Sequence, residues 1–324
     1  MYNQTDAILS QYEIEIHEIT KGRGSFICST DQGKMMLVPF RGSKEKGMSL
    51  YLFLKGLMER NFLVEQIILT REQEAVAEDD FTGERYILKN YVEGVEISTS
   101  KPEDMKEAVR MLAIYHNIAG QLVSERELQQ NMNGITEPWQ RHYRELIKVR
   151  NYIRNTKKKN EFEQIYMKHF EHNRKAAEES LRVLELAAIE ANPYVICHGD
   201  FNQHNVLLSK GVYRIVHFEN FVLHWSMIDL ANFVRKMLEK NEWNEAMGKE
   251  LISEYDRYRP ITQTEYKLLY GLLLFPEKFW KVTNHYMNSR KTWISGREVD
   301  KLKKVIDQEE KRLKFMENVF AFLI

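Results

Sequence analysis

The chain has 324 residues, which is enough for one large or two medium domains, each with its own hydrophobic core. Apolar residues make up 43% and aromatic residues 11% of the chain, a composition that excludes a disordered protein. Lys plus Arg and Asp plus Glu both number 47, so there is no overall basic field of the kind that attracts nucleic acid or an anionic membrane.

The two cysteines, Cys28 and Cys197, each lie in an apolar run, which indicates small buried thiols rather than a disulfide framework. The N-terminus has no basic start followed by an apolar stretch. The longest apolar run, from Leu268 to Phe275, is too short to span a bilayer. We therefore expect a chain that is cytoplasmic at synthesis and has neither nucleic acid nor membrane as a partner.

The first ninety or so residues are predicted to form a small antiparallel sheet. Apolar and charged residues alternate from Tyr12 to Ile16, and GSFICST, KMMLVPF, FLVEQIILT and ERYILKNYV also have strand character. One helical stretch interrupts them, with Leu50, Phe53, Leu54 and Leu57 on one face. The pattern predicts five strands and one helix within residues 1–92.

From Ser100 the pattern becomes helical and stays mainly helical to the C-terminus. Ser100 and Glu103 have the spacing of a capping box, and Met105 begins an apolar helical face. A strand pair, NVLL and VYRIVHF, interrupts the helices. The sequence thus predicts a small lobe over residues 1–95 and a helical lobe over residues 96–324.

The segment HGDFNQHN, from His198 to Asn205, carries the strongest chemical signal. It follows an apolar run and precedes a strand, so it is expected to be a loop. An Asp that accepts a hydroxyl proton and an Asn five residues later that holds a metal form an effective pair for phosphoryl transfer. The alternative is that Asp200 and Asn205 only satisfy turn backbone groups. A zinc site at His198, His204 and His217 is not supported, because no Cys or carboxylate completes a ligand spacing.

The HGDxxxxN loop resembles the catalytic loop of the aminoglycoside phosphotransferase and choline kinase superfamily. Three further stretches, YILKNYVEGVE, IDLANFVRKML and FPEKFWKVTNHYMNSRKTW, resemble the spore-coat CotS-type proteins of endospore-forming bacteria. The resemblance spreads over most of the chain. It implies an α+β, bilobal protein-kinase-like fold, with a small antiparallel-sheet lobe and a larger mainly helical lobe.

The resemblance also implies roles for individual residues. Asp200 matches the catalytic base, His198 a residue that orients the loop, and Asp229 a residue that braces local backbone. Metal-binding positions fall on Asn205, His217 and Glu219. The nucleotide-binding positions that the resemblance implies are the strand at the lobe junction, with Lys89, Tyr91 and Glu93, and a glycine turn with Gly22 and Gly24.

Two positions of the chain, His217 and Val38, depart from the family pattern. His217 stands where active relatives have a magnesium-binding Asp, and a neutral imidazole is a poor ligand for a hard cation. Val38 stands where relatives have the strand Lys that pairs the nucleotide phosphates. Each lost charge removes about 2–4 kcal/mol of transition-state stabilisation. Glu219 is a possible replacement metal ligand, so activity is not excluded.

Three functions follow from this sequence. The first is a catalytically impaired kinase, a pseudokinase, that is a structural or binding component of the spore coat, with other spore-coat proteins as partners. The second is an active ATP-dependent phosphotransferase for a small hydroxyl or amino compound. The third is a pseudokinase that binds a nucleotide or metabolite and regulates a partner. ATP and magnesium are expected as cofactors if the protein is active, and none is required otherwise. The first is the favoured prediction because the departures remove charge from the phosphate site but spare the fold.

Overall fold

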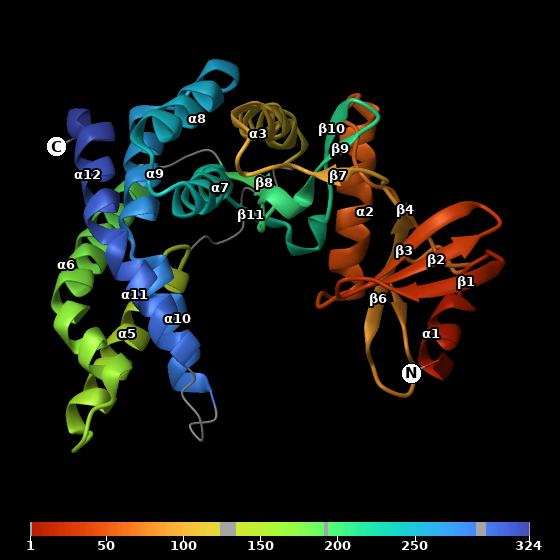
Figure 1. Ribbon diagram of the computed structural model, residues 1–324. Coiled ribbons are helices and arrows are strands. Elements are labelled where there is room, and N and C mark those ends of the chain that lie inside the picture. The colour runs from red at the N-terminus through yellow and green to blue at the C-terminus, as the bar shows by residue number, and fades with distance from the viewer. Residues whose placement is uncertain (1, 124–133, 191–193, 290–295, 324) are drawn as a thin grey trace.

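The protein, described by a computed structural model over residues 2–123, 134–190, 194–289 and 296–323, has two lobes of different composition (Figure 1). A small lobe holds an antiparallel sheet, and a larger lobe is mainly helical. This confirms the α+β, bilobal architecture expected from the sequence. None of the helices in the described ranges combines the length and the hydropathy that a membrane span requires.

The small lobe is built on a six-stranded antiparallel sheet, one strand more than predicted. The strand order is β1-β2-β3-β6-β4, with β5 paired to β6. The strands are β1 (Ile16–Lys21), β2 (Phe26–Thr30), β3 (Gly33–Pro39), β4 (Ile67–Ile68), β5 (Ala77–Glu78) and β6 (Arg85–Asn90). The additional strand is β5, whose two residues are too few to give a periodic signal, whereas β4 lies within the predicted strand FLVEQIILT.

Helices cover both faces of this sheet, although only one helix was predicted. The missed helix is α1 (Tyr2–Leu9), and the first strand begins at Ile16 rather than near Tyr12. Ile8, Leu9 and Tyr12 are buried with Leu37 of β3 on one face. On the opposite face α2 (Lys44–Glu59) buries its predicted apolar stripe against Val38 of β3. The alternation around Tyr12 arose from a segment that packs on the sheet without joining it.

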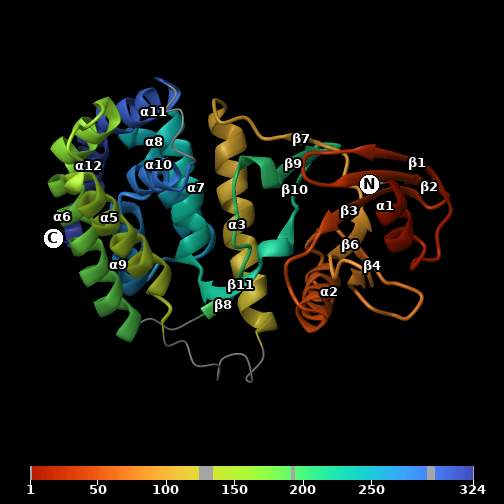
Figure 2. The ribbon, with the colours of Figure 1, turned by 90° about the horizontal axis from the view of Figure 1, so that it is seen from below.

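The larger lobe begins after a connection that contains only the short strand β7 (Val95–Glu96). Its helices are α3 (Pro102–Leu122), α5 (Glu137–Asn155), α6 (Glu161–Glu190), α7 (Met227–Lys240), α8 (Glu245–Tyr258), α9 (Gln263–Leu274), α10 (Glu277–Asn288), α11 (Gly296–Asp307) and α12 (Glu309–Val319). Figure 2 shows α3 between the sheet and the other helices.

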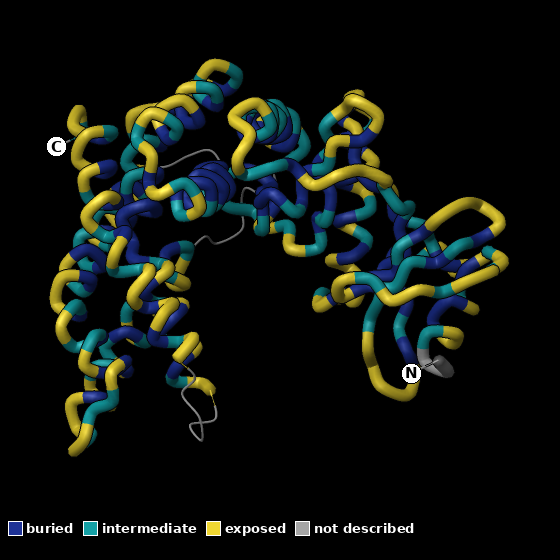
Figure 3. The backbone as a smooth tube through the Cα atoms, viewed as in Figure 1, coloured by how far each residue is buried: buried dark blue, intermediate teal, exposed yellow. Residues whose placement is uncertain are grey.

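The predicted capping box at the start of α3 is wrong. The residue before the helix is Lys101, and no side chain caps this end. Instead the Asp104 carboxylate accepts the backbone N–H of Ser98 at 2.8 Å. The apolar face of α3 is buried as predicted, including Met105 and Leu112, and Figure 3 shows α3 largely in the colours of buried and intermediate residues.

Short strands flank the loop from His198 to Asn205, which lies between helices of the larger lobe. β8 (Tyr194–Cys197) pairs antiparallel with β11 (Val222–Trp225). The predicted hairpin is present as β9 (Val206–Ser209) and β10 (Val212–Ile215), and β9 also pairs with β7. Two-residue turns of this kind need positive φ, which Lys210 and Gly211 adopt at 50° and 80°. The loop from His198 to Asn205 is therefore held between two strand pairs, next to the small lobe.

Candidate active site

The loop that follows β8 is held by its own polar side chains. The amide nitrogens of Asn202 and Asn205 donate hydrogen bonds to the backbone oxygen of Asp200, at 2.8 and 2.9 Å. The Asn202 side-chain oxygen accepts the backbone N–H of His204 and caps a short 3₁₀ turn, Gln203–Asn205. These contacts fix the backbone while the Asp200 carboxylate stays 45% exposed.

His198 holds this loop from beneath. Its side chain is fully buried, with Nε2 at 2.9 Å from the backbone oxygen of Val216 and Nδ1 accepting the backbone N–H of Asp200 at 3.2 Å. The ring also packs on Phe218, with centroids 4.7 Å apart. Because both ring nitrogens are occupied and buried, His198 is a positioning residue and not a group that can touch a substrate.

Gly199 and Asp229 fix the entry to the loop. Gly199 has φ +80°, and a Cβ there would lie 2.0 Å from the backbone oxygen of Asn220, so only glycine fits. Asp229, in the first turn of α7, accepts the backbone N–H groups of His198 and Gly199 at 2.6 and 3.0 Å. Burial would raise the pKa of Asp229, but His116 and the His198 backbone outweigh it and lower that pKa. The expected bracing role of Asp229 is thus visible in its contacts.

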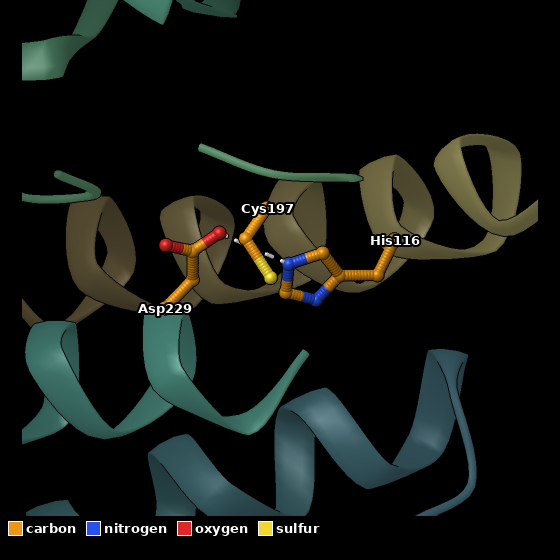
Figure 4. Close-up of side chains that lie close together, drawn as sticks. All are labelled: His116, Cys197 and Asp229. Atoms are coloured by element: carbon orange, nitrogen blue, oxygen red, sulfur yellow. Dashed lines mark hydrogen bonds and ion pairs between the residues drawn. The ribbon is translucent and has the colours of Figure 1, made fainter. Parts of the chain in front are cut away.

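Three side chains of the types that bind metal ions lie together behind the loop. Ligand atoms of His116, Cys197 and Asp229 are all within 4.8 Å of one another, and Figure 4 shows the three side chains close together. Each already has a protein partner: His116 Nδ1 is 2.7 Å from the Tyr255 hydroxyl, its Nε2 is 3.3 Å from Asp229, and Cys197 Sγ is 3.2 Å from the backbone oxygen of Trp225. Burial also raises the pKa of Cys197, so the thiolate that a metal requires is disfavoured. The group is a buried hydrogen-bond network that supports the loop.

Both cysteines are therefore expected to be unreactive in the folded protein. Burial raises the pKa of Cys28 to about 11 and also raises that of Cys197. A thiol reagent such as dithionitrobenzoate at pH 7.5 should label neither cysteine until denaturant unfolds the chain, when both should react. Rapid labelling of Cys197 in the native state would contradict the network described above.

The cleft between the lobes brings together most of the residues predicted to act. One cavity of about 530 Å³ is lined by Asp200, Asn205, His217 and Glu219 from the large lobe, and by Gly22, Lys89 and Tyr91 from the small lobe. Gly24 and Glu93 are not among its lining residues. Glu93 instead forms an exposed ion pair with Lys34, at 2.8 Å.

Three histidines considered for zinc do not converge. His198 lies beneath the loop, while the ring of His204 contacts Glu96 at 2.5 Å. His217 lies in the cleft with Nδ1 3.3 Å from the Lys89 ammonium nitrogen. His217 also has φ +69°, a left-handed conformation that histidine tolerates better than most residues.

Lys89 projects into the cleft beside two residues of the expected metal-binding element, His217 and Glu219. It lies on β6 opposite Met36 of β3, and its side chain is 2% exposed. The ammonium group contacts Glu65 at 2.9 Å, is in close contact with Glu219, and also approaches His217. An ammonium has three donors, so Lys89 is saturated by these three groups.

The carboxylate of Glu65 extends this network into the backbone. Its Oε1 accepts the N–H groups of His217 and Phe218 at 2.9 and 3.1 Å. Burial would raise the pKa of Glu219, but Lys89 and then His217 outweigh it and hold that pKa below its ordinary value. Burial likewise acts against charge on Lys89, but Glu65 and Glu219 raise its pKa. The lobes are therefore joined by a buried network in which Lys89 and Glu219 hold each other in the charged form.

Val38 lies on the inner face of the sheet but outside the cleft. It is 6% exposed within the apolar cluster formed with α2, and it pairs with Ile87 of β6. On this face Met36 and Lys89 are paired one step nearer the lobe junction. The sequence has no cation at Val38, but the neighbouring strand β6 carries one, Lys89. The partner of Lys89 is Glu219, the carboxylate of the expected metal-binding element.

Several contacts of the site had no recognisable signal in the sequence. Glu65 precedes a two-residue strand, and Lys89 was predicted as a nucleotide-binding residue at the lobe junction but not as a partner of Glu65 and Glu219. Lys236, with its ammonium nitrogen 3.3 Å from Asp200, lies on an ordinary amphipathic helix, α7. Arg23, between the two glycines, lines the cleft. The spacing of Gly22 and Gly24 was the only feature that could have indicated Arg23.

The architecture and the loop define a protein-kinase-like fold of the small-molecule-kinase type. An aminoglycoside phosphotransferase from Alicyclobacillus acidocaldarius has a TM-score of 0.81 to this structure at 18% identity, covering 98% of this chain and 95% of that one. The amicoumacin kinase hAmiN, in complex with AMP-PNP, Ca²⁺ and Ami, has a TM-score of 0.62 at 13% identity, covering 97% and 93%. At these identities the likeness shows the fold alone.

The family is shown by sequence. Spore coat protein S of Bacillus subtilis (strain 168) is 22% identical over 329 residues, covering 96% of this chain and 92% of that protein. Residues 5–319 match the family described as "Spore coat putative kinase YutH", and the chain belongs to this family. The resemblance to spore-coat kinase-like proteins is confirmed. The final residues of the FPEKFW to SRKTW segment, 290–293, lie outside the described residues.

Proposed function

We propose that this protein is a kinase-like component of the bacterial spore coat in which phosphate transfer is absent or strongly impaired. Membership of the spore-coat family and the similarity to Spore coat protein S support the location and its link to sporulation. The fold supports a kinase ancestry. The protein then acts as a structural or binding component, with other coat proteins as partners.

The contact between Lys89 and Glu219 is the observation that carries this proposal. Glu219 is the only carboxylate of the His217-Phe218-Glu219 element, and Lys89 neutralises it inside the cleft. Magnesium needs several oxygen ligands in a nearly octahedral arrangement. With Glu219 and Glu65 bound to Lys89, and a nitrogen ligand at His217, the described residues do not fit this ion.

The cleft nevertheless has the size of a small-molecule site. Its volume of about 530 Å³ lies in the range of ordinary ligand pockets, and Arg23 and Tyr91 line it. A nucleotide without metal could occupy this space. Such binding would support the third function, a pseudokinase that binds a nucleotide and regulates a partner. That function differs from a structural component of the coat only in needing a ligand.

The active phosphotransferase is a second candidate that one observation favours. Asp200 is exposed in the cleft and its backbone is fixed, as a general base requires. Activity would require Lys89 to release Glu219, so that the carboxylate becomes available. An ATP-dependent transfer to a small hydroxyl or amino compound would then be the reaction.

A melting experiment separates the two candidates. Adding 5 mM ATP and 10 mM magnesium should raise the melting temperature of the natural protein very little, because the metal lacks ligands. A ligand present at 100 times its Kd would stabilise the fold by about 2.7 kcal/mol, which corresponds to a shift on the order of 5 °C. A shift of that size, together with phosphate transfer that Asp200→Asn abolishes, would establish the active enzyme instead.

A matched variant pair tests the cause. Lys89→Met with His217→Asp removes the competing ammonium and adds a carboxylate, so 10 mM magnesium should stabilise this variant but not the natural protein. His217→Asp alone keeps Lys89 and serves as the control, with little response to magnesium. If that single variant gains as much as the double variant, Lys89 is not what prevents metal binding.

A further inference from the structure

A second and larger cavity opens on the other side of Asp200. Its volume is about 900 Å³, and it lies among the catalytic-type loop, α7, α10 and α11. Asp200, Asn202 and His204 line both this cavity and the interlobe cleft, so the two spaces adjoin. A compound bound in this cavity would therefore lie next to Asp200.

The cavity is strongly basic although the whole chain is neutral. Against three carboxylates it carries six lysines: Lys236, Lys240, Lys278, Lys281, Lys301 and Lys304. With Lys plus Arg and Asp plus Glu both at 47, this excess is local. A concave surface with one sign of charge concentrates ligands of the opposite sign.

The carboxylates do not neutralise all of these lysines. Three of the lysines pair with carboxylates of the cavity lining, at 3.3 Å for Lys236 and Asp200, 3.2 Å for Lys278 and Glu239, and 3.0 Å for Lys301 and Glu298. Lys281 pairs with Glu277, outside the lining, at 3.1 Å. Glu239 is also shared with Arg235, at 2.8 Å. Lys240 and Lys304 have no ion pair with any residue of the described ranges. Burial lowers the pKa of Lys236, although Asp200 acts in the opposite direction.

The fold explains why the lysines meet. α10 packs its apolar face, with Phe279, Val282 and Tyr286, into the core of the large lobe. Lys278 and Lys281 are exposed on the same helix. α11 packs next to α10 and faces the cavity with Lys301 and Lys304. Two amphipathic helices thus turn basic faces toward one hollow instead of toward bulk water.

We propose that this cavity binds a small molecule with at least two negative charges, carried by carboxylate or phosphate groups. A protonated amine would be repelled by the lysines. The cavity has the volume of a small-molecule site, and walls from three helices favour a compact ligand over a long acidic segment of another protein. Because anion binding needs neither nucleotide nor turnover, the proposal goes beyond the function proposed above and does not depend on it.

Calorimetric titration of the full chain, without nucleotide and at 20 mM salt, tests this proposal. Citrate and inorganic pyrophosphate represent the carboxylate and phosphate arms, choline the cation, and a hexaglutamate peptide the acidic segment. At least one of the two anions should bind with a Kd below 1 mM, more weakly at 300 mM salt, while choline should not bind. The arm that binds more tightly identifies the anionic group. If neither anion binds, if choline binds as well, or if the peptide binds more tightly than both anions, the proposal is wrong.

Paired substitutions locate the binding. Lys240→Gln with Lys304→Gln removes the two lysines that lack ion pairs and should raise the Kd of the anion at least tenfold, because each removed ammonium group takes away a charge-assisted hydrogen bond to the anion. The control, Lys168→Gln with Lys175→Gln, removes the same charge from exposed positions of α6 outside the cavity. An equal loss in the control would show that only general charge attraction is involved, and would overturn the assignment.

Discussion

Lys89→Met is expected to lower the free energy of unfolding by about 3–5 kcal/mol at pH 7, because removing one member of a buried ion-pair network leaves its partners uncompensated. Lys89 is 2% exposed and bridges Glu65 and Glu219, which are 4% and 17% exposed. Methionine keeps most of the volume, so the loss comes from charge and not from a cavity. Urea denaturation measures the effect.

The pH dependence of this loss has a definite sign. In the natural protein Lys89 holds the pKa of Glu219 below its ordinary 4.5, so its contribution is present above pH 4.5 and disappears as the pH falls through the lower folded value. In Lys89→Met, burial acts without this cation and favours the protonated acid. The stability gap between the two proteins should therefore narrow from pH 7 to pH 4.

Lys34→Met is the matched control for Lys89→Met. Lys34 also pairs with a glutamate from the small lobe, but both side chains are more than half exposed, so water and salt screen the interaction. This variant should unfold at nearly the same urea concentration as the natural protein at every pH. If Lys89→Met also lowers the free energy of unfolding only slightly, the buried network contributes little to holding the two lobes together.

Asp229→Ala should also cost about 3–5 kcal/mol, because it leaves three buried hydrogen-bonding partners unsatisfied. Asp229 is 1% exposed and accepts the backbone N–H groups of His198 and Gly199 as well as a contact from His116. Each buried polar group left without a partner costs about 1–3 kcal/mol. Urea denaturation and amide hydrogen exchange of the loop would report the loss globally and locally.

Asp229→Asn separates charge from hydrogen bonding. It keeps an oxygen acceptor for one backbone N–H, so its loss should be smaller than that of Asp229→Ala. The pKa of Asp229 is lowered in the folded state, so its carboxylate contributes stability above its ordinary pKa of 3.8 that is lost as the pH falls through the lower folded value. Asp229→Asn should remove this part of the acid sensitivity. Asp300→Ala, at an exposed position of α11, is the control and should change little; a comparable loss there would contradict the bracing role.

Patterns that are local in the sequence were predicted well. The helical faces of α2 and α3 repeat every three to four residues, and the β9–β10 hairpin is marked by its turn, so neighbouring residues suffice to specify them. The HGDFNQHN loop was recognisable because its residues act together within eight positions. The helix α1 and the short strand β5 were missed, because eight or two residues give too few periods to decide.

The sequence by itself determined the bilobal kinase-like fold and the family, and it predicted the catalytic-type loop around Asp200 and the two departures at Val38 and His217. Only the tertiary structure decided which charged groups meet in the cleft. Lys89 is one of 47 basic residues, and it meets Glu219 across 130 positions because the register of β6 turns its side chain into the cleft. The six lysines of the large cavity converge for a similar reason, since helix packing, and not any local pattern, directs their faces to one hollow. Interactions between distant residues depend on packing geometry, which a single sequence does not display.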